Sequence, residues 1–84
     1  MALPNEPVTL SVEQIKELNQ RLLTMRHDVN NHLSLMMAAL ELIRRQPESA
    51  DRLLGTLIEQ PRKISETITK FSGEWDTAVG ITRS

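Results

Sequence analysis

A run of 35 residues without glycine or proline, from Val12 to Gln46, is the feature that most limits how this chain can fold. Both residue types break helices, so their absence favours one helix roughly 50 Å long, well above the globular average. Ser11 and Gln14 have the spacing of a capping box, in which each side chain bonds the backbone amide of the other. Pro47 ends the run. The sequence therefore predicts a helix from Val12 to about Gln46.

A second helix is predicted from about Ala50 to about Trp75, after a short turn in which Ser49 is the expected N-cap. Pro61 lies inside this helix. Because proline lacks the backbone donor and clashes with the preceding turn, we expect a kink there, or two helical pieces that meet.

The two ends of the chain have a different composition from the helices. Residues 1–10 hold two of the four prolines, so we expect a flexible lead-in. Two glycines accompany the end of the second predicted helix, and residues 76–84 are expected to form a disordered tail.

Apolar positions recur at alternating spacings of three and four in both predicted helices, as in a heptad. The stripe of the first helix contains Ile15, Leu18, Leu22, Met25, Val29, His32, Met36, Ala39 and Ile43. The stripe of the second contains Leu54, Leu57, Pro61, Ile64, Ile68, Phe71 and Trp75. Two such helices joined by a short turn form an antiparallel hairpin, so the predicted fold class is all-α.

After Val29 the first helix becomes apolar nearly all round and needs neighbours on more than one side. The additional apolar residues are Leu33, Leu35, Met37, Leu40 and Leu42. Two copies of the hairpin packed as a four-helix bundle satisfy this requirement, so we expect a homodimer. The alternative is a helix supplied by a different protein.

The composition argues against several classes of function. With 84 residues the chain forms one domain at most, and a net charge of −1 gives no reason to expect a nucleic-acid partner. The chain has no cysteine, which rules out disulfides and thiolate metal sites. Its longest apolar run, residues 35–40, is too short to span a membrane, and its N-terminus is not a secretory signal. We expect a cytoplasmic protein without a membrane segment.

His27 falls at heptad position f, which faces away from the apolar stripe. Asp28, Asn30 and Asn31 follow it, so polar groups gather near an imidazole that is open to solvent. This arrangement suits a phosphoryl acceptor better than a structural histidine, although a merely exposed histidine is the alternative. A metal site is not expected, because His27 and His32 point to different faces.

The segment MRHDVNNHL, residues 25–33, resembles the H-box of the dimerisation and histidine-phosphotransfer (DHp) domain of two-component sensor histidine kinases. It is close to the His-Asp-x-Asn-Asn variant and is also similar to the sporulation phosphotransferase B group. The segment ITKFS, residues 68–72, is similar to the Leu-x-x-Phe-Ser that closes many such domains. The resemblance assigns residues 11–75 to one DHp-like hairpin.

The resemblance implies a role for each of three side chains. His27 matches the phosphoacceptor, and Asp28 matches the acidic neighbour that orients the imidazole and accepts its proton. Asn31 matches the residue that positions the attacking water when such domains dephosphorylate a response regulator. Members of the commonest subfamily have a proline where this chain has His32, so the bend that the proline gives is not expected here. We interpret His32 as a core histidine with one hydrogen bond; a surface pair between Asp28 and His32 is the alternative.

No nucleotide-binding motif follows residue 75, so the chain is expected to hold no cofactor of its own. ATP and Mg²⁺ would act only through a separate kinase ATP-binding domain. The expected function is to accept a phosphoryl group on His27 and pass it to the receiver aspartate of a response regulator, which would dock near Thr67 and Lys70. The chain is then a kinase fragment or a histidine phosphotransferase, and whether it counts as an enzyme stays open. The alternative function is a catalytically silent all-α homodimerisation or scaffold module.

Overall fold

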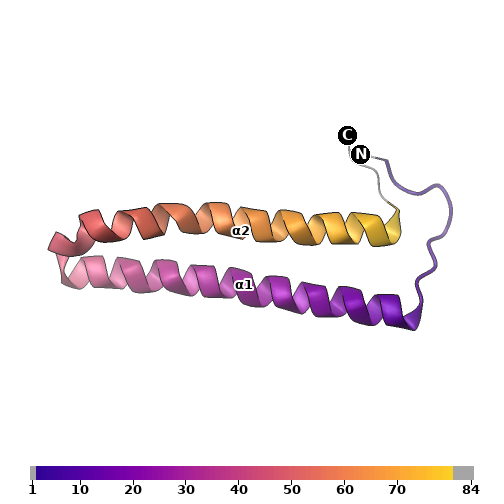
Figure 1. The fold of residues 1–84 in the computed structure, drawn as a ribbon, viewed down its shortest axis with the longest axis horizontal. Helices are drawn as coiled ribbons and strands as arrows, with labels where there is room; N and C mark the ends of the chain where they lie inside the picture. The colour runs from indigo at the N-terminus through magenta and orange to yellow at the C-terminus, as the bar shows by residue number, and fades with distance from the viewer. Residues whose placement is uncertain (1, 81–84) are drawn as a thin grey trace.

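The computed structural model describes residues 2–80. It contains helix α1 (Val12–Arg45), a single 3-10 turn η1 (Pro47–Ser49) and helix α2 (Ala50–Val79). The two long helices lie antiparallel and side by side, and η1 joins them at one end (Figure 1). The prediction of an all-α hairpin is confirmed.

α1 begins where the capping box predicts. The Ser11 hydroxyl accepts from the Gln14 amide at 3.1 Å, and Gln14 Oε1 accepts from the Ser11 amide at 2.8 Å. Leu10 and Ile15, on either side of this box, line the same shallow groove, which is the arrangement of a hydrophobic staple. The box and the staple together fix the direction in which the chain enters α1.

The prediction that Ser49 caps α2 is wrong. Its backbone is helical (φ −84°, ψ −4°), and its side chain makes no capping bond to α2. The hydroxyl instead donates to the Gln46 carbonyl at 2.7 Å, and the residue is buried. The 3-10 turn therefore leads directly into α2, which leaves no extended residue in which a serine cap could form.

α2 ends four residues later than predicted, at Val79 rather than near Trp75. Residues 76–79, predicted as the start of the disordered tail, are helical, and residues 81–84 lie outside the described part of the chain. Gly80 follows with φ 74°, the left-handed conformation that glycine adopts at helix ends, and its amide donates to the Asp76 carbonyl. Gly73 does not end the helix, since this last stretch still packs on α1 through Glu74 and Ala78.

α2 continues without interruption through Pro61. The helix is therefore one piece rather than two that meet. The proline ring is exposed, while Gln60 and Ile64 on either side of it contribute to the packing against α1. Packing on both sides of the proline holds the helix together where one backbone hydrogen bond is lost.

The packed stripe of α1 is the predicted one except at its start, where Ile15 is 54% exposed. On α2 only part of the predicted stripe packs: Leu57, Ile64 and Phe71 are half-buried, but Leu54, Ile68 and Trp75 are exposed. The stripe of α2 that is covered contains Leu53, Leu57, Gln60, Ile64, Thr67, Phe71, Glu74 and Ala78. Half of its positions precede the predicted ones by one residue, so the centre of the stripe is rotated by roughly 50° from the prediction.

Candidate functional site

The hairpin has two broad sides of opposite character. Each helix has two stripes: one packs against the other helix, and one is apolar and exposed. Around the axis of each helix, the exposed stripe lies roughly 80–90° from the packed one, in the same rotational sense when the helix is viewed along its chain direction. Because the helices are antiparallel, equal turns bring both exposed stripes to one side of the hairpin, which we call the apolar side. Its residues are Ile15, Leu33, Met37, Leu40, Leu54, Ile58, Ile68 and Trp75, between 43% and 73% exposed.

A shallow groove of about 240 Å³ confirms that the two stripes share one side, because Ile15 of α1 and Trp75 of α2 both line it. The opposite side, the polar side, carries two adjoining grooves of about 530 and 130 Å³. Arg21, Lys70 and Glu74 line both of these grooves.

His27 is exposed and lies about 165° around α1 from the centre of the packed stripe. It is also more than about 100° from the centre of the apolar stripe of α1. Its imidazole therefore faces away from α2 and away from the apolar side. One turn later, Asn31 places its side-chain nitrogen 3.3 Å from Nε2 of His27. The structure thus brings two of the three predicted site residues into contact.

Asp28, the third predicted residue, is half-buried and lines the smaller polar groove together with Thr67 and Lys70 of α2. It makes no hydrogen bond or ion pair with any residue between 2 and 80. The carboxylate therefore lies beside His27 in the chain but faces the groove. Thr67 donates its own hydroxyl to the Lys63 carbonyl at 2.9 Å, so it is held against α2.

An ion pair that the sequence did not predict joins the helices across the polar side. Arg21 lies 3.2 Å from Glu74 and also binds Glu17. The hydrogen bond with Glu17 is the largest cause that raises the pKa of the Arg21 guanidinium above its ordinary value, and both carboxylates add to it. No sequence signal indicated this pair, because the predicted stripe placed Trp75 in the seam, whereas the structure covers Glu74 instead.

His32 is half-buried between the helices, as interpreted from the sequence, and has one hydrogen bond. Its Nδ1 lies 2.7 Å from Oε1 of Gln60, whose side-chain nitrogen donates to the Thr56 carbonyl at 3.1 Å. Gln60 is only 3% exposed. The structure does not pair His32 with Asp28, so His32 connects the helices rather than taking part in the candidate site.

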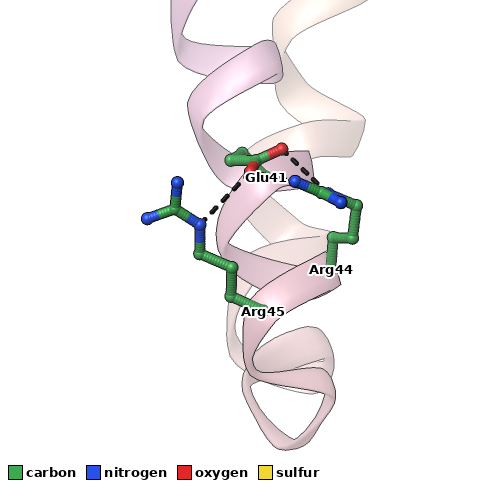
Figure 2. Close-up of polar contacts among 3 residues, drawn as sticks. All are labelled: Glu41, Arg44 and Arg45. Atoms are coloured by element: carbon green, nitrogen blue, oxygen red, sulfur yellow. Dashed lines mark hydrogen bonds and ion pairs between the residues drawn. The ribbon is translucent and has the colours of Figure 1, made fainter.

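Most cations in the described chain already have carboxylate partners, and the exceptions are Arg26, Arg52 and Lys70. At the turn end of α1, Glu41 binds Arg44 at 2.5 and 3.1 Å and Arg45 at 3.2 Å (Figure 2). The hydrogen bonds from Arg44 are the largest cause that lowers the pKa of Glu41. This cluster is fourteen residues from His27 along the helix, about 21 Å. Of the three cations unpaired within residues 2–80, Lys70 is the one that lines the smaller polar groove together with Asp28.

Residues 2–80 lack the features of two other kinds of site. Within this range no three histidine, cysteine, aspartate or glutamate side chains gather as metal ligands would. Over the same range, neither helix combines the length and apolar character that a bilayer-spanning segment needs.

Comparison of the chain with models of known protein families, with characterised proteins and with solved structures found no match. The likeness to DHp domains therefore depends on the residues of the H-box and of the closing segment, and a function based on it is a proposal.

Proposed function

We propose that this chain is the phosphoacceptor and dimerisation module of a two-component phosphorelay, with His27 as the residue that carries the phosphoryl group. The observation that supports this most is the placement of His27. It is exposed on α1 and in contact with Asn31. It also lies away from the stripe that packs on α2 and away from the apolar side. A histidine in this position keeps its ring free even after the apolar side is covered.

The reaction asks little of the protein beyond positioning. Nε2 of His27 attacks phosphorus in line and forms the P–N bond, while the bond from phosphorus to the leaving oxygen of ATP or of an acyl phosphate breaks. The Nδ1 proton then passes to water or to the Asp28 carboxylate, which would have to rotate out of the groove to act as general base. The receiver aspartate later takes the phosphoryl group from Nε2.

The apolar side supports the second half of the proposal, a homodimer. Its eight side chains are each about half exposed, so covering them recovers roughly half of the ~1.5–3 kcal/mol of a full burial. The total is on the order of 10 kcal/mol per protomer before association entropy. We propose that a second copy covers this side and completes a four-helix bundle, because a lone hairpin buries only Ala39 among its described apolar residues.

In this proposal the partners on the polar side are a receiver domain and, for phosphorylation by ATP, a separate kinase ATP-binding domain, all in the cytoplasm. Lys70, unpaired within residues 2–80, and Thr67 stand on α2 beside Asp28 and offer polar contacts to a receiver. Such contacts orient a partner more than they add affinity.

Labelling with ³²P-acetyl phosphate tests the function. The wild type should take up label that is stable to base and lost in acid, and the His27→Gln variant should take up none. His27 is exposed and far from the packed stripe, so this variant should keep its helical circular dichroism. A folded wild type that stays unlabelled with acetyl phosphate and with phosphoramidate would instead support the catalytically silent scaffold.

A further inference from the structure

We infer that Asn31 is a positioning residue that sets the tautomer of His27, holding the ring proton on Nδ1 and leaving the lone pair of Nε2 as the nucleophile. The inference deepens the proposed function and rests on it for its biological meaning. The tautomer itself is a property of the unphosphorylated protein and can be measured without any phosphoryl donor.

The geometry makes this assignment through the chemistry of the amide. The side-chain nitrogen of Asn31, 3.3 Å from Nε2, carries two hydrogens and no free lone pair, so it can only donate. Nε2 must then accept, and a neutral imidazole whose Nε2 accepts carries its proton on Nδ1. The i to i+4 spacing on one helix keeps the two side chains together without help from α2.

The contact is suited to a reaction in which it must break. At 3.3 Å between exposed groups it is longer than an ordinary N–H hydrogen bond, so losing it when phosphorus approaches slows the reaction by less than about tenfold. After transfer, the same amide lies next to the phosphoryl oxygens on Nε2 and can donate to them, which makes a stronger, charge-assisted bond. The Asn31 amide thus donates a hydrogen bond to the Nε2 lone pair before the transfer and to the phosphoryl oxygens after it.

The chain supplies its own controls. Asn30 is also exposed, but it makes no hydrogen bond within residues 2–80, so Asn30→Asp introduces the same charge one residue away without replacing the donor. His32 provides an internal reference, because its Nδ1 must donate to Gln60 Oε1, which accepts only. Its tautomer should not respond to changes at Asn31.

The test is a long-range ¹H–¹⁵N correlation spectrum of both imidazoles at about pH 9, where a surface histidine is neutral. We expect Nδ1–H for His27 in the wild type and in Asn30→Asp. In Asn31→Asp the carboxylate accepts instead of donating, so His27 should change to Nε2–H while His32 stays unchanged. A wild-type His27 with its proton on Nε2, or an Asn31→Asp variant with an unaltered tautomer, would overturn the inference.

A second measurement separates this inference from the proposed function. Phosphoramidate needs no docking, so its rate of phosphorylating His27 reports on the ring alone. In Asn31→Asp the Nε2–H is bonded to a charged carboxylate, so the rate should be about tenfold to a hundredfold below that in Asn30→Asp, the range of a hydrogen bond to a charged group. Equal rates in the two variants would contradict the role of the tautomer, whereas a wild type without any phosphohistidine would refute the proposed function and leave the spectroscopic result standing.

Discussion

At the scale of the residue, the direction of the Asp28 side chain determines whether its carboxylate can reach the imidazole of His27. Asp28 follows His27 directly, yet its half-buried carboxylate lines the groove toward Thr67 and Lys70 rather than bonding the ring. In the general-base role that we propose, the carboxylate must rotate to reach the Nδ1 proton, and apo geometry of this kind is common for groups that act in acid–base catalysis.

We predict that Asp28→Asn slows phosphorylation of His27 by acetyl phosphate by about 100-fold, the lower end of what a general base contributes. The initial rate of ³²P uptake measures it, and the defect should shrink as pH rises because hydroxide can then remove the proton. Asp51→Asn removes an exposed carboxylate near the turn and should leave the rate unchanged. An Asp28→Asn rate within twofold of wild type at every pH would show that Asp28 is only a surface carboxylate.

At this scale the sequence proposes candidate residues but does not show how they are arranged. The spacing of His27 and Asn31 predicts that they share a face, and the structure adds which atoms meet. Spacing on one helix could not indicate that Asp28 would face Lys70, because that depends on how α2 is rotated against α1.

At the scale of the element, hydrophobic periodicity predicted the helices well and the rotation of α2 badly. The long uninterrupted run and the capping box fixed α1 within a residue or two. On α2 the periodicity placed Leu54, Ile68 and Trp75 in the hairpin seam, whereas Gln60, Thr67 and Glu74 are covered there. Each of these three polar residues has a hydrogen-bond or ion-pair partner, which an apolar pattern cannot reveal.

The bond between His32 and Gln60 yields a prediction about stability. Gln60→Leu leaves the Nδ1–H of His32 without an acceptor in the seam, so the free energy of unfolding should fall by about 1–3 kcal/mol. Urea denaturation measures this loss. The double variant His32→Leu, Gln60→Leu replaces both polar groups and should recover most of it. If the double variant is as unstable as the single one, the bond is not what holds Gln60 in the seam.

The cluster at the turn end of α1 predicts an acid dependence. Because the hydrogen bonds from Arg44 lower the pKa of Glu41 in the folded state, this carboxylate adds stability above its ordinary pKa of about 4.5. The contribution is lost as pH falls through the lower, folded pKa. In thermal melts the Glu41→Gln variant should therefore have a shallower decline of Tm below about pH 4.5 than the wild type. Parallel declines in the two proteins would contradict this assignment.

At the scale of the whole molecule, the division into a polar and an apolar side organises the proposal. His27, Asn31 and the grooves can meet donors and receivers only if another surface carries the dimer contact. The sequence indicated that α1 needs more than one neighbour, but it could not tell that Leu33, Met37 and Leu40 would share one side of the hairpin while Leu35 lies on the other. That follows from the rotation of both helices, seen in the groove that Ile15 and Trp75 line together.

We predict a dimer in sedimentation equilibrium, and a monomer for the double variant Met37→Glu, Leu40→Glu. These side chains are 71% and 55% exposed on the apolar side, so two charges there would be buried at the interface. Leu35 is 52% exposed but lies about 140–160° around α1 from both, so Leu35→Glu should remain dimeric. A wild type that sediments as a single hairpin, or a dimer that only Leu35→Glu disrupts, would refute the proposed interface.

The location of the phosphoryl group after treatment of the intact protein with phosphoramidate decides whether His27 is the phosphoacceptor. Both histidines lie on α1, and fragmentation of the phosphorylated chain by electron-transfer mass spectrometry distinguishes them. We predict one phosphoryl group per chain, on His27, with the hydrogen-bonded His32 unmodified. A folded protein that carries the group on His32, or carries none, would contradict it.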